Sequence, residues 1–115
     1  MDRPSAQALS DAEVDRIFRA LADATRRDIV RRTLTEAITV SALAADYDMS
    51  FAAVQKHVSV LEAAGLVTKQ PHGRERLVRG DPNTIRTAQS LLNQYEEIWR
   101  GRIDRLDSLL AEDSD

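Results

Sequence analysis

Residues 40–67 decide the fold, and they read VSALAADYDMSFAAVQKHVSVLEAAGLV. Thr39 and Ser50 are suited to begin helices, because a hydroxyl oxygen just before a helix accepts hydrogen bonds from its free backbone amides. The expected helices cover 40–46 and 51–64, and only a few residues separate them. Two short helices joined by a tight turn are typical of a helix-turn-helix.

The spacing within this unit supports the interpretation. With Val40 as the first position, the unit requires a small fifth residue, a ninth residue that tolerates a left-handed conformation and an apolar fifteenth residue. Ala44, Asp48 and Val54 stand at these positions. Glycine is commoner in the turn, but an aspartate tolerates positive φ better than most side chains do.

A β-hairpin is expected directly after the second helix. Gly65 stands where a left-handed helix stop is expected, after an apolar stripe that continues from Val54. Two β-prone runs follow at 66–70 and 75–79, and the turn-forming residues Pro71-His72-Gly73-Arg74 lie between them. A hairpin at this place makes the unit a winged helix-turn-helix.

Two further helices are predicted before this unit. Ser10 and Glu13 have the spacing of a capping box, so a helix is expected from there to about Leu21. Asp23 can cap the next helix, over 24–35. Its expected inward residues are Ile29, Val30 and Leu34, and its expected solvated residues are Arg26, Arg27, Arg31 and Arg32.

Asp81-Pro82 begins a last helix that is expected to continue to about Ala111. The predicted class is therefore mainly α with a small β-hairpin wing, in the order α-α-α-α-β-β-α and dimeric. We expect a single domain over 10–111, with a flexible N-terminus at 1–9 and a flexible tail at 112–115.

Composition limits the possible functions. The 115 residues are 43% hydrophobic and contain no cysteine, so one modest core is expected, and disulfides, thiolate metal sites and thiol redox sensing are excluded. The chain has no apolar run of membrane-spanning length and no signal-like start. A cytoplasmic location without a membrane partner is the expectation.

The net charge of −3 is unevenly distributed. The stretch 55–79 contains five basic and two acidic residues, whereas 96–115 contains three basic and seven acidic ones. Nucleic-acid binding depends on local clusters of lysine and arginine, so the first stretch is a candidate for it.

The predicted DNA-contacting residues lie on the outer side of the second helix-turn-helix helix and on the wing. Gln55 can pair with adenine, Lys56 with guanine or phosphate, and Phe51 can touch a thymine methyl group. Arg74 on the turn suits a phosphate or a narrow minor groove. The full set is Ser50, Phe51, Ala52, Ala53, Gln55, Lys56, His57, Ser59, Arg74 and Arg76. His57 fits either a phosphate contact or a scaffold role, and His72 fits either a turn or a DNA contact.

An apolar stripe on the last helix has nearly heptad spacing, broken at Arg102, and indicates packing against another helix. Because this helix is longer than the domain can cover, we expect a second copy of the chain as its partner. The predicted dimerisation residues are Val14, Ile17, Phe18, Leu21, Ile85, Ala88, Leu92, Tyr95, Trp99, Leu106 and Leu109. Tyr95 and Trp99 can alternatively line a pocket for an apolar inducer.

Several separated segments together resemble the ArsR/SmtB family of bacterial repressors. They are ALADATRR with Ile29, VSALA, VQKHVSVLEAAGLV and Gly73-Arg74-Glu75. The resemblance covers about 17–105, and the ending from Trp99 is similar to a metal-independent subgroup. It implies a homodimer built from first and last helices that represses a nearby operon and releases DNA when an inducer or other signal arrives.

The chain departs from the family's metal-sensing members. The family's thiolate motif lies in the third helix, where 40–46 has no cysteine, and its other common site uses histidines on the last helix, which has none. Glu96 and Glu97 are adjacent carboxylates that fit a solvated face better than a metal site. No metal and no cofactor are expected.

The expected partners are therefore operator DNA, a second copy of the chain and an unidentified inducer. No catalytic triad, phosphate loop or paired-carboxylate motif is present, so no enzymatic activity is expected. The alternative is a winged-helix protein-interaction module without sequence-specific DNA binding, which the overall negative charge favours and the local basic stretch opposes.

Overall fold

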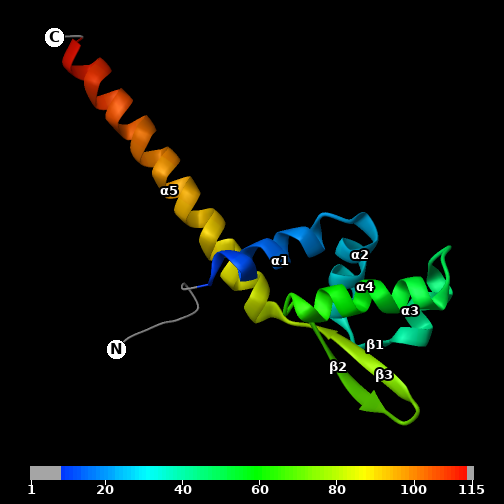
Figure 1. Cartoon of the computed structure of the whole chain (residues 1–115). Coiled ribbons are helices and arrows are strands. Elements are labelled where there is room, and N and C mark those ends of the chain that lie inside the picture. The colour runs from blue at the N-terminus through cyan, green and yellow to red at the C-terminus, as the bar shows by residue number, and fades with distance from the viewer. Residues whose placement is uncertain (1–8, 114–115) are drawn as a thin grey trace, which may run out of the picture.

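The computed structural model describes residues 9–113, which form five helices and three short strands (Figure 1). Their bounds are α1 (Asp11–Leu21), α2 (Ala24–Thr35), β1 (Ile38–Thr39), α3 (Val40–Asp46), α4 (Phe51–Ala63), β2 (Val67–His72), β3 (Glu75–Gly80) and α5 (Pro82–Asp113). The predicted class, mainly α with a small β-hairpin wing, is confirmed.

The helices begin where short polar side chains predict. Ser10 and Glu13 form the expected capping box, and the side chains of Asp23, Thr39 and Ser50 each accept from the backbone amide three residues later. Helix α4 ends at Ala63, with Gly65 in the left-handed conformation at φ +77°. These local signals explain why the predicted bounds of α2 and α3 agree with the structure.

One apolar core joins helices α1 to α4 and the sheet. Ile29, Leu43, Val58 and Val78 are fully buried and come from four different elements. Ile17 and Ala20 from α1 and Ala88 from the first turns of α5 complete the core. The core therefore holds the helix-turn-helix, the wing and the base of α5 together.

The sheet contains one strand that the sequence did not predict. β1 is only two residues long, too short to show the alternation that marks a strand, yet it pairs antiparallel with β3. The order is β1-β3-β2, so β3 lies in the centre and Val78 pairs with both Ile38 and Lys69.

The hairpin turn is tighter than predicted. Pro71 and His72 belong to β2 and pair with Arg76 and Glu75, so the turn itself consists of Gly73 and Arg74. Gly73 has φ +65°, which a glycine adopts without steric cost. Pro71 is tolerated because β2 is an edge strand of the sheet.

Leu34 was predicted to face inward, but it is 42% exposed. It lies near the end of α2 against Gly80 of β3, where a Cβ on the glycine would be only 2.8 Å from Leu34 Cγ. The side chain therefore covers the end of β3 instead of entering the core. Thr33 takes the buried position and satisfies its hydroxyl by donating to the Ile29 carbonyl oxygen at 2.7 Å.

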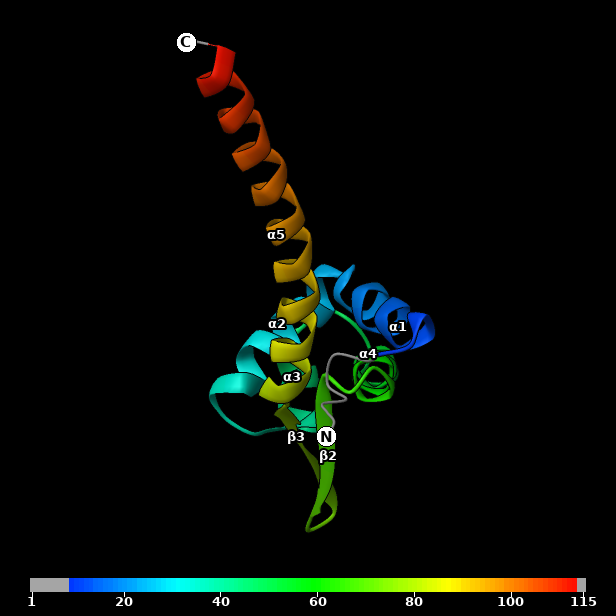
Figure 2. The same cartoon turned by 90° about the vertical axis from the view of Figure 1, so that its left-hand side faces the viewer.

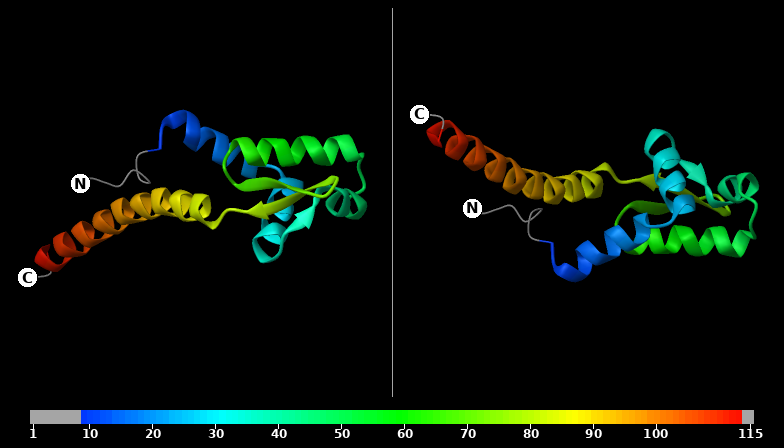
Figure 3. Two further views of the ribbon diagram at one scale, coloured as in Figure 1. Left: turned by 90° about the horizontal axis from the view of Figure 1, so that it is seen from below. Right: turned by 90° about the horizontal axis from the view of Figure 1, so that it is seen from above.

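Helix α5 leaves the body and continues far beyond it (Figures 1 and 2). It has 32 residues, which corresponds to about 48 Å at the usual helical rise, and the molecule measures 73 × 39 × 24 Å. Views from below and above show that its outer part has no other element of the chain beside it (Figure 3). Its side chains there have only solvent or a partner to contact.

Leu9 and residues 112–113, which belong to the two ends that the sequence predicts to be flexible, are among the described residues. Leu9 is partly buried against the core, because it is apolar and directly precedes the capped start of α1. Helix α5 continues to Asp113, two residues past the expected end. The remaining residues of these two segments, 1–8 and 114–115, lie outside the described part of the chain.

Candidate nucleic-acid interface

The outer side of helix α4 is mainly polar because its apolar side packs into the core. Val54, Val58 and Leu61 are fully buried and fix the rotation of the helix. Most of the predicted DNA-contacting residues of α4 and its cap are consequently exposed. The exposed ones are Ser50, Phe51, Ala52, Gln55, Lys56 and Ser59, and the partly buried ones are Ala53 and His57.

The turn of the helix-turn-helix is formed differently from the prediction. Asp48 was expected to tolerate a left-handed conformation, but no described residue other than glycine has a positive φ. Helix α3 instead ends with Tyr47 in an extended conformation, and Ser50 is extended as well. The connection 47–50 is long enough to change direction through extended residues, so it needs no left-handed one. Ala44 is partly buried against the core, as a small fifth residue permits.

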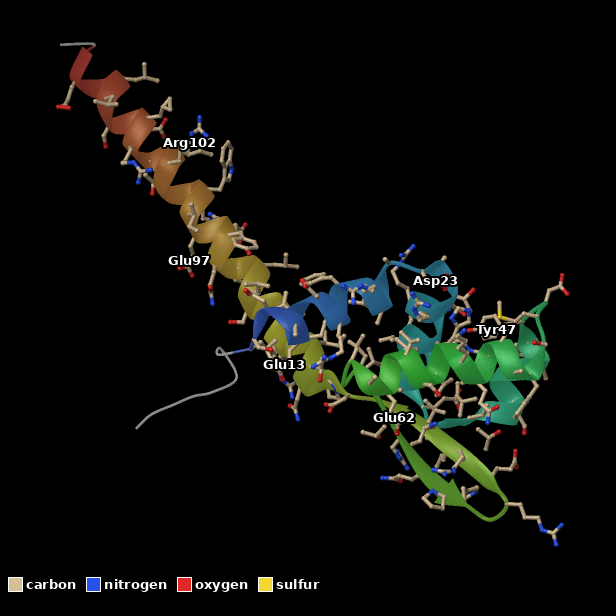
Figure 4. The ribbon with its side chains drawn as sticks, in the orientation of Figure 1. Glu13, Asp23, Tyr47, Glu62, Glu97 and Arg102 are labelled. Atoms are coloured by element: carbon tan, nitrogen blue, oxygen red, sulfur yellow. The ribbon has the colours of Figure 1, made fainter. Side chains whose placement is uncertain are left out.

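Tyr47 fixes this turn to α2. Its hydroxyl donates to Asp28 Oδ2 at 2.6 Å, and the Arg32 guanidinium lies 5.5 Å from the centre of its ring (Figure 4). Arg32 also pairs with Asp46 at 2.6 Å, and Arg31 pairs with Asp28. The hydrogen bond from Tyr47 lowers the pKa of Asp28, while burial and that same bond raise the pKa of Tyr47.

The expectation that the arginines of α2 form a solvated face is wrong for Arg26 and Arg32, which are partly buried, whereas Arg27 and Arg31 are exposed. Arg32 takes part in the Tyr47 contacts, and Arg26 donates to carbonyl oxygens at the end of α1, as the exposed Arg27 also does. Arg26 also contacts His57 of α4, with 3.2 Å between its Nη1 and the Nδ1 of the imidazole. Sequence reasoning missed these contacts because each joins residues 6 to 31 positions apart and leaves no periodic signal.

The wing presents cations without acidic partners. Arg74 at the tip and Arg76 and Arg79 on β3 are exposed, and across 9–113 none of the three forms an ion pair. Lys69, by contrast, pairs with Glu62 of α4 at 3.4 Å, which connects the wing to α4 near the end where Figure 4 shows Glu62. The wing therefore combines a base that is joined to α4 with exposed arginines at its tip and along β3.

The predicted dimerisation residues fall into two groups. Ile17 and Ala88 are buried in the protomer's own core, and Val14, Leu21 and Ile85 are partly buried. The others are exposed large apolar or aromatic side chains. They are Phe18, Leu92, Tyr95, Trp99, Leu106 and Leu109.

Ile98, Ile103 and Leu110 extend this exposed apolar surface. Arg102, labelled in Figure 4, breaks the heptad spacing, and its guanidinium carbon lies 5.9 Å from the centre of the Trp99 ring. A groove of about 320 Å³ includes Trp99 but not Tyr95. Residues of α5 alone line it, so it is a space between neighbouring side chains of one helix.

No group of three or more metal-ligating side chains comes together within the part of the chain that the structure describes. In the same part, no helix combines the length and the apolar character that a membrane crossing requires.

Known proteins match both the sequence and the structure. A family model described as a helix-turn-helix domain matches residues 21–70. The HTH-type transcriptional regulator Rv2034 of Mycobacterium tuberculosis is 38% identical over 81 residues, which is 70% of this chain and 76% of the relative. The segment that the family model matches, 21–70, contains the whole helix-turn-helix unit at 40–63.

Two solved structures share the architecture. The ArsR family transcriptional regulator RHA00566 has a TM-score of 0.75 and 30% identity, covering 80% of this chain and 95% of that one. An ArsR-like transcriptional regulator from Rhodococcus sp. RHA1 has a TM-score of 0.75 and 28% identity, covering 85% and 92%. The chain therefore belongs to the ArsR family of helix-turn-helix transcriptional regulators.

Proposed function

We propose that this regulator is a repressor that binds an imperfect palindromic operator as a homodimer and controls its own promoter. The observation that carries the proposal is the pairing of two exposed surfaces on one rigid protomer. One is the polar outer side of α4 with the cationic wing, and the other is the apolar stripe of α5.

Helix α4 is suited to the major groove. Gln55 and Lys56 are exposed in its first half, where a recognition helix contacts base edges, and Ala52 is small enough for close approach. Phe51 is 49% exposed at the first position of the helix and offers an apolar surface for a thymine methyl group. In this proposal Gln55 and its neighbours read the sequence.

The wing is suited to the phosphate backbone or to the minor groove beside it. Arg74 and Arg76 have no acidic partner within residues 9–113, so binding a phosphate would not require breaking an ion pair. Arg26 and Arg27, in contrast, donate to carbonyl oxygens of α1, so a phosphate would have to compete with these hydrogen bonds.

The homodimer is supported by the amount of apolar surface that one protomer leaves uncovered. Trp99 is 55% and Leu106 is 48% exposed on the outer part of α5, beside which no other described element lies (Figure 3). A second copy would offer the same stripe, and a two-fold axis would place two α4 helices for two successive major grooves, about 34 Å apart. The acidic outer part of α5 would then lie away from the DNA-binding surfaces.

Regulation by an inducer and a cytoplasmic location complete the proposal. The first follows the family resemblance, and the second follows from where bacterial operators are found.

Fluorescence anisotropy with the intergenic DNA upstream of the gene tests the proposal, with a scrambled duplex as control. We expect preference for the native fragment and a slope of log affinity against log salt of about −5, from Lys56, Arg74 and Arg76 in each of two protomers. Equal affinity for both duplexes would contradict the operator. Absence of binding at low salt would favour the protein-interaction module.

A further inference from the structure

Arg26 joins three helices through its guanidinium group. Its Nε donates to the Ala20 carbonyl oxygen at 2.7 Å, and its Nη2 donates to the Arg19 carbonyl oxygen at 3.1 Å. Its remaining nitrogen, Nη1, lies 3.2 Å from Nδ1 of His57 on α4. All three nitrogens of the guanidinium therefore have an acceptor, and the third acceptor belongs to the proposed recognition helix.

The chemistry of the guanidinium determines the direction of the bond to His57. Arginine carries only donors and stays charged, so Nδ1 of the imidazole must accept and cannot carry a proton. A protonated Nδ1 would lose this bond and place two positive charges 3.2 Å apart. An imidazole that accepts at Nδ1 has its ring proton on Nε2.

The Nε2–H group forms no hydrogen bond within residues 9–113, although the carboxylate of Asp23 interacts electrostatically with the imidazole. His57 is partly exposed. Nε2 of His57 is therefore a hydrogen-bond donor at a partly exposed position. It can donate to an acceptor that comes from outside the protomer.

The position of His57 on α4 indicates which acceptor this is. At 100° per residue, His57 lies between the buried side, marked by Val54 and Val58, and the centre of the outer side, near Lys56. When a helix lies in a major groove, residues at the margin of its outer side approach the phosphates that border the groove, whereas central residues approach the bases. A phosphate oxygen has no proton and can only accept.

We propose that Arg26 is a positioning residue for DNA binding, because it holds His57 in the Nε2–H tautomer that donates to a DNA phosphate. This inference rests on the proposed function, in which α4 lies in the major groove. It gives Arg26 a role in affinity without any contact between Arg26 and DNA.

The first test is made on the DNA-free protein. Two-bond ¹⁵N–¹H correlation spectra at neutral pH distinguish the two tautomers, and the chain has only His57 and His72 to assign. The expected spectrum of His57 shows a proton on Nε2 and a bare Nδ1, and the spectrum of Arg26→Met loses this preference. His72, which is exposed on the wing, should be unchanged by that variant and is the internal reference.

The second test is a double-mutant cycle measured by anisotropy. We expect Arg26→Met and His57→Ala each to weaken binding to operator and scrambled duplexes alike, by about three- to tenfold. In the His57→Ala background, Arg26→Met should have no further effect on affinity. His57→Gln, which keeps an amide donor near the position of Nε2, should retain most of the affinity.

Arg27→Met is the matched control, because Arg27 donates to the Leu21 carbonyl oxygen at 2.8 Å but does not contact His57. It should leave the tautomer unchanged and the affinity within about twofold. Equal effects of both arginine variants, or independent effects of Arg26 and His57, would overturn the inference. If Arg26→Met does not fold, the His57 tautomer of the unmodified protein still tests the inference. A proton on Nδ1 of His57 would refute it. Failure of the unmodified protein to bind any duplex would refute the proposed function instead, whatever the tautomer.

Discussion

Helices α4 and α5 are both half exposed in the protomer, but their outer sides differ in chemistry. Apart from Phe51 at its first position, α4 presents mainly alanine, glutamine, lysine and serine to solvent, whereas α5 also presents leucine, isoleucine, tyrosine and tryptophan. The difference arises from packing. α4 has buried Val54, Val58 and Leu61 in the core, and the outer part of α5 has no core to reach.

This comparison indicates what each surface requires from a partner. Hydrogen-bond donors and cationic side chains can bind a hydrated polyanion such as DNA. Before DNA binds, water hydrates the same side chains, so their exposure costs little free energy. A large apolar surface loses free energy in water until another apolar surface covers it. One protomer therefore carries two unlike surfaces, and substitutions on each should have distinguishable effects.

The largest effect is expected from Leu106→Glu. A carboxylate in the centre of the apolar stripe should prevent the two α5 helices from packing, because it would be buried without a partner. Sedimentation velocity should show monomers, and operator affinity should fall by at least about 100-fold, since the second half-site would no longer be bound by the same particle.

Ser108→Glu is the control for this prediction. Ser108 is exposed two residues further along the same helix, about 200° away from Leu106 and thus on the opposite side. This variant should remain dimeric with unchanged affinity. Dimers of Leu106→Glu at micromolar concentration would mean that the stripe is not the interface.

A smaller effect is expected from Gln55→Ala on the polar surface. The loss of a base contact should reduce the difference in binding free energy between operator and scrambled DNA by about 1 to 3 kcal/mol, with little change for the scrambled duplex. Competition anisotropy measures the affinities for operator and for scrambled DNA. Gln89→Ala, which removes an exposed glutamine from α5, should change neither affinity. An unchanged specificity for Gln55→Ala would mean that Gln55 does not contact a base.

Arg74→Ala should have a different signature. Because a phosphate contact carries no sequence information, binding to every duplex should weaken, by roughly tenfold at moderate salt, and the salt slope should become less steep by about 2 for a dimer. Arg86→Ala on α5 is the control for the loss of one exposed charge. A selective loss for the operator alone would indicate that Arg74 reads bases or groove width.

The smallest effect is expected from Tyr47→Phe, which removes the hydroxyl bound to Asp28. Urea unfolding at neutral pH should show a loss of about 1 kcal/mol. The folded protein holds the pKa of Asp28 below its ordinary value of 3.8, so this stability is present above that value and is lost as the pH falls through the lower one. The difference in unfolding free energy between the parent and Tyr47→Phe should therefore become smaller in acid. A difference that does not change with pH would mean that the hydroxyl acts through packing.

The sequence allowed the helices to be predicted because their signals are local. Ser10, Asp23, Thr39 and Ser50 each act on an amide three residues away, so their effect can be recognised without knowing the fold. The outer side of α4 was predictable for a similar reason, since burial of Val54 and Val58 determines which of its residues remain exposed.

Features that depend on distant partners could not be predicted in this way. The contacts of Tyr47 with Asp28 and of Arg26 with His57 join residues 19 and 31 positions apart. Strand β1 exists only because it pairs with β3. Leu34 is exposed because its side chain packs against Gly80 at the end of β3. In each case the deciding neighbour comes from a different element of the fold.

The register of the wing also has a consequence for how its reach can vary. β2 and β3 pair residue for residue up to the two-residue turn, and β1 pairs only with Leu77 and Val78 in the middle of β3. Because side chains alternate between the faces of a strand, adding two residues to each strand beside Gly73 would lengthen the hairpin without reversing its faces. The wing is thus a spacer whose length can change in steps of two, while the helices that it adjoins keep their places.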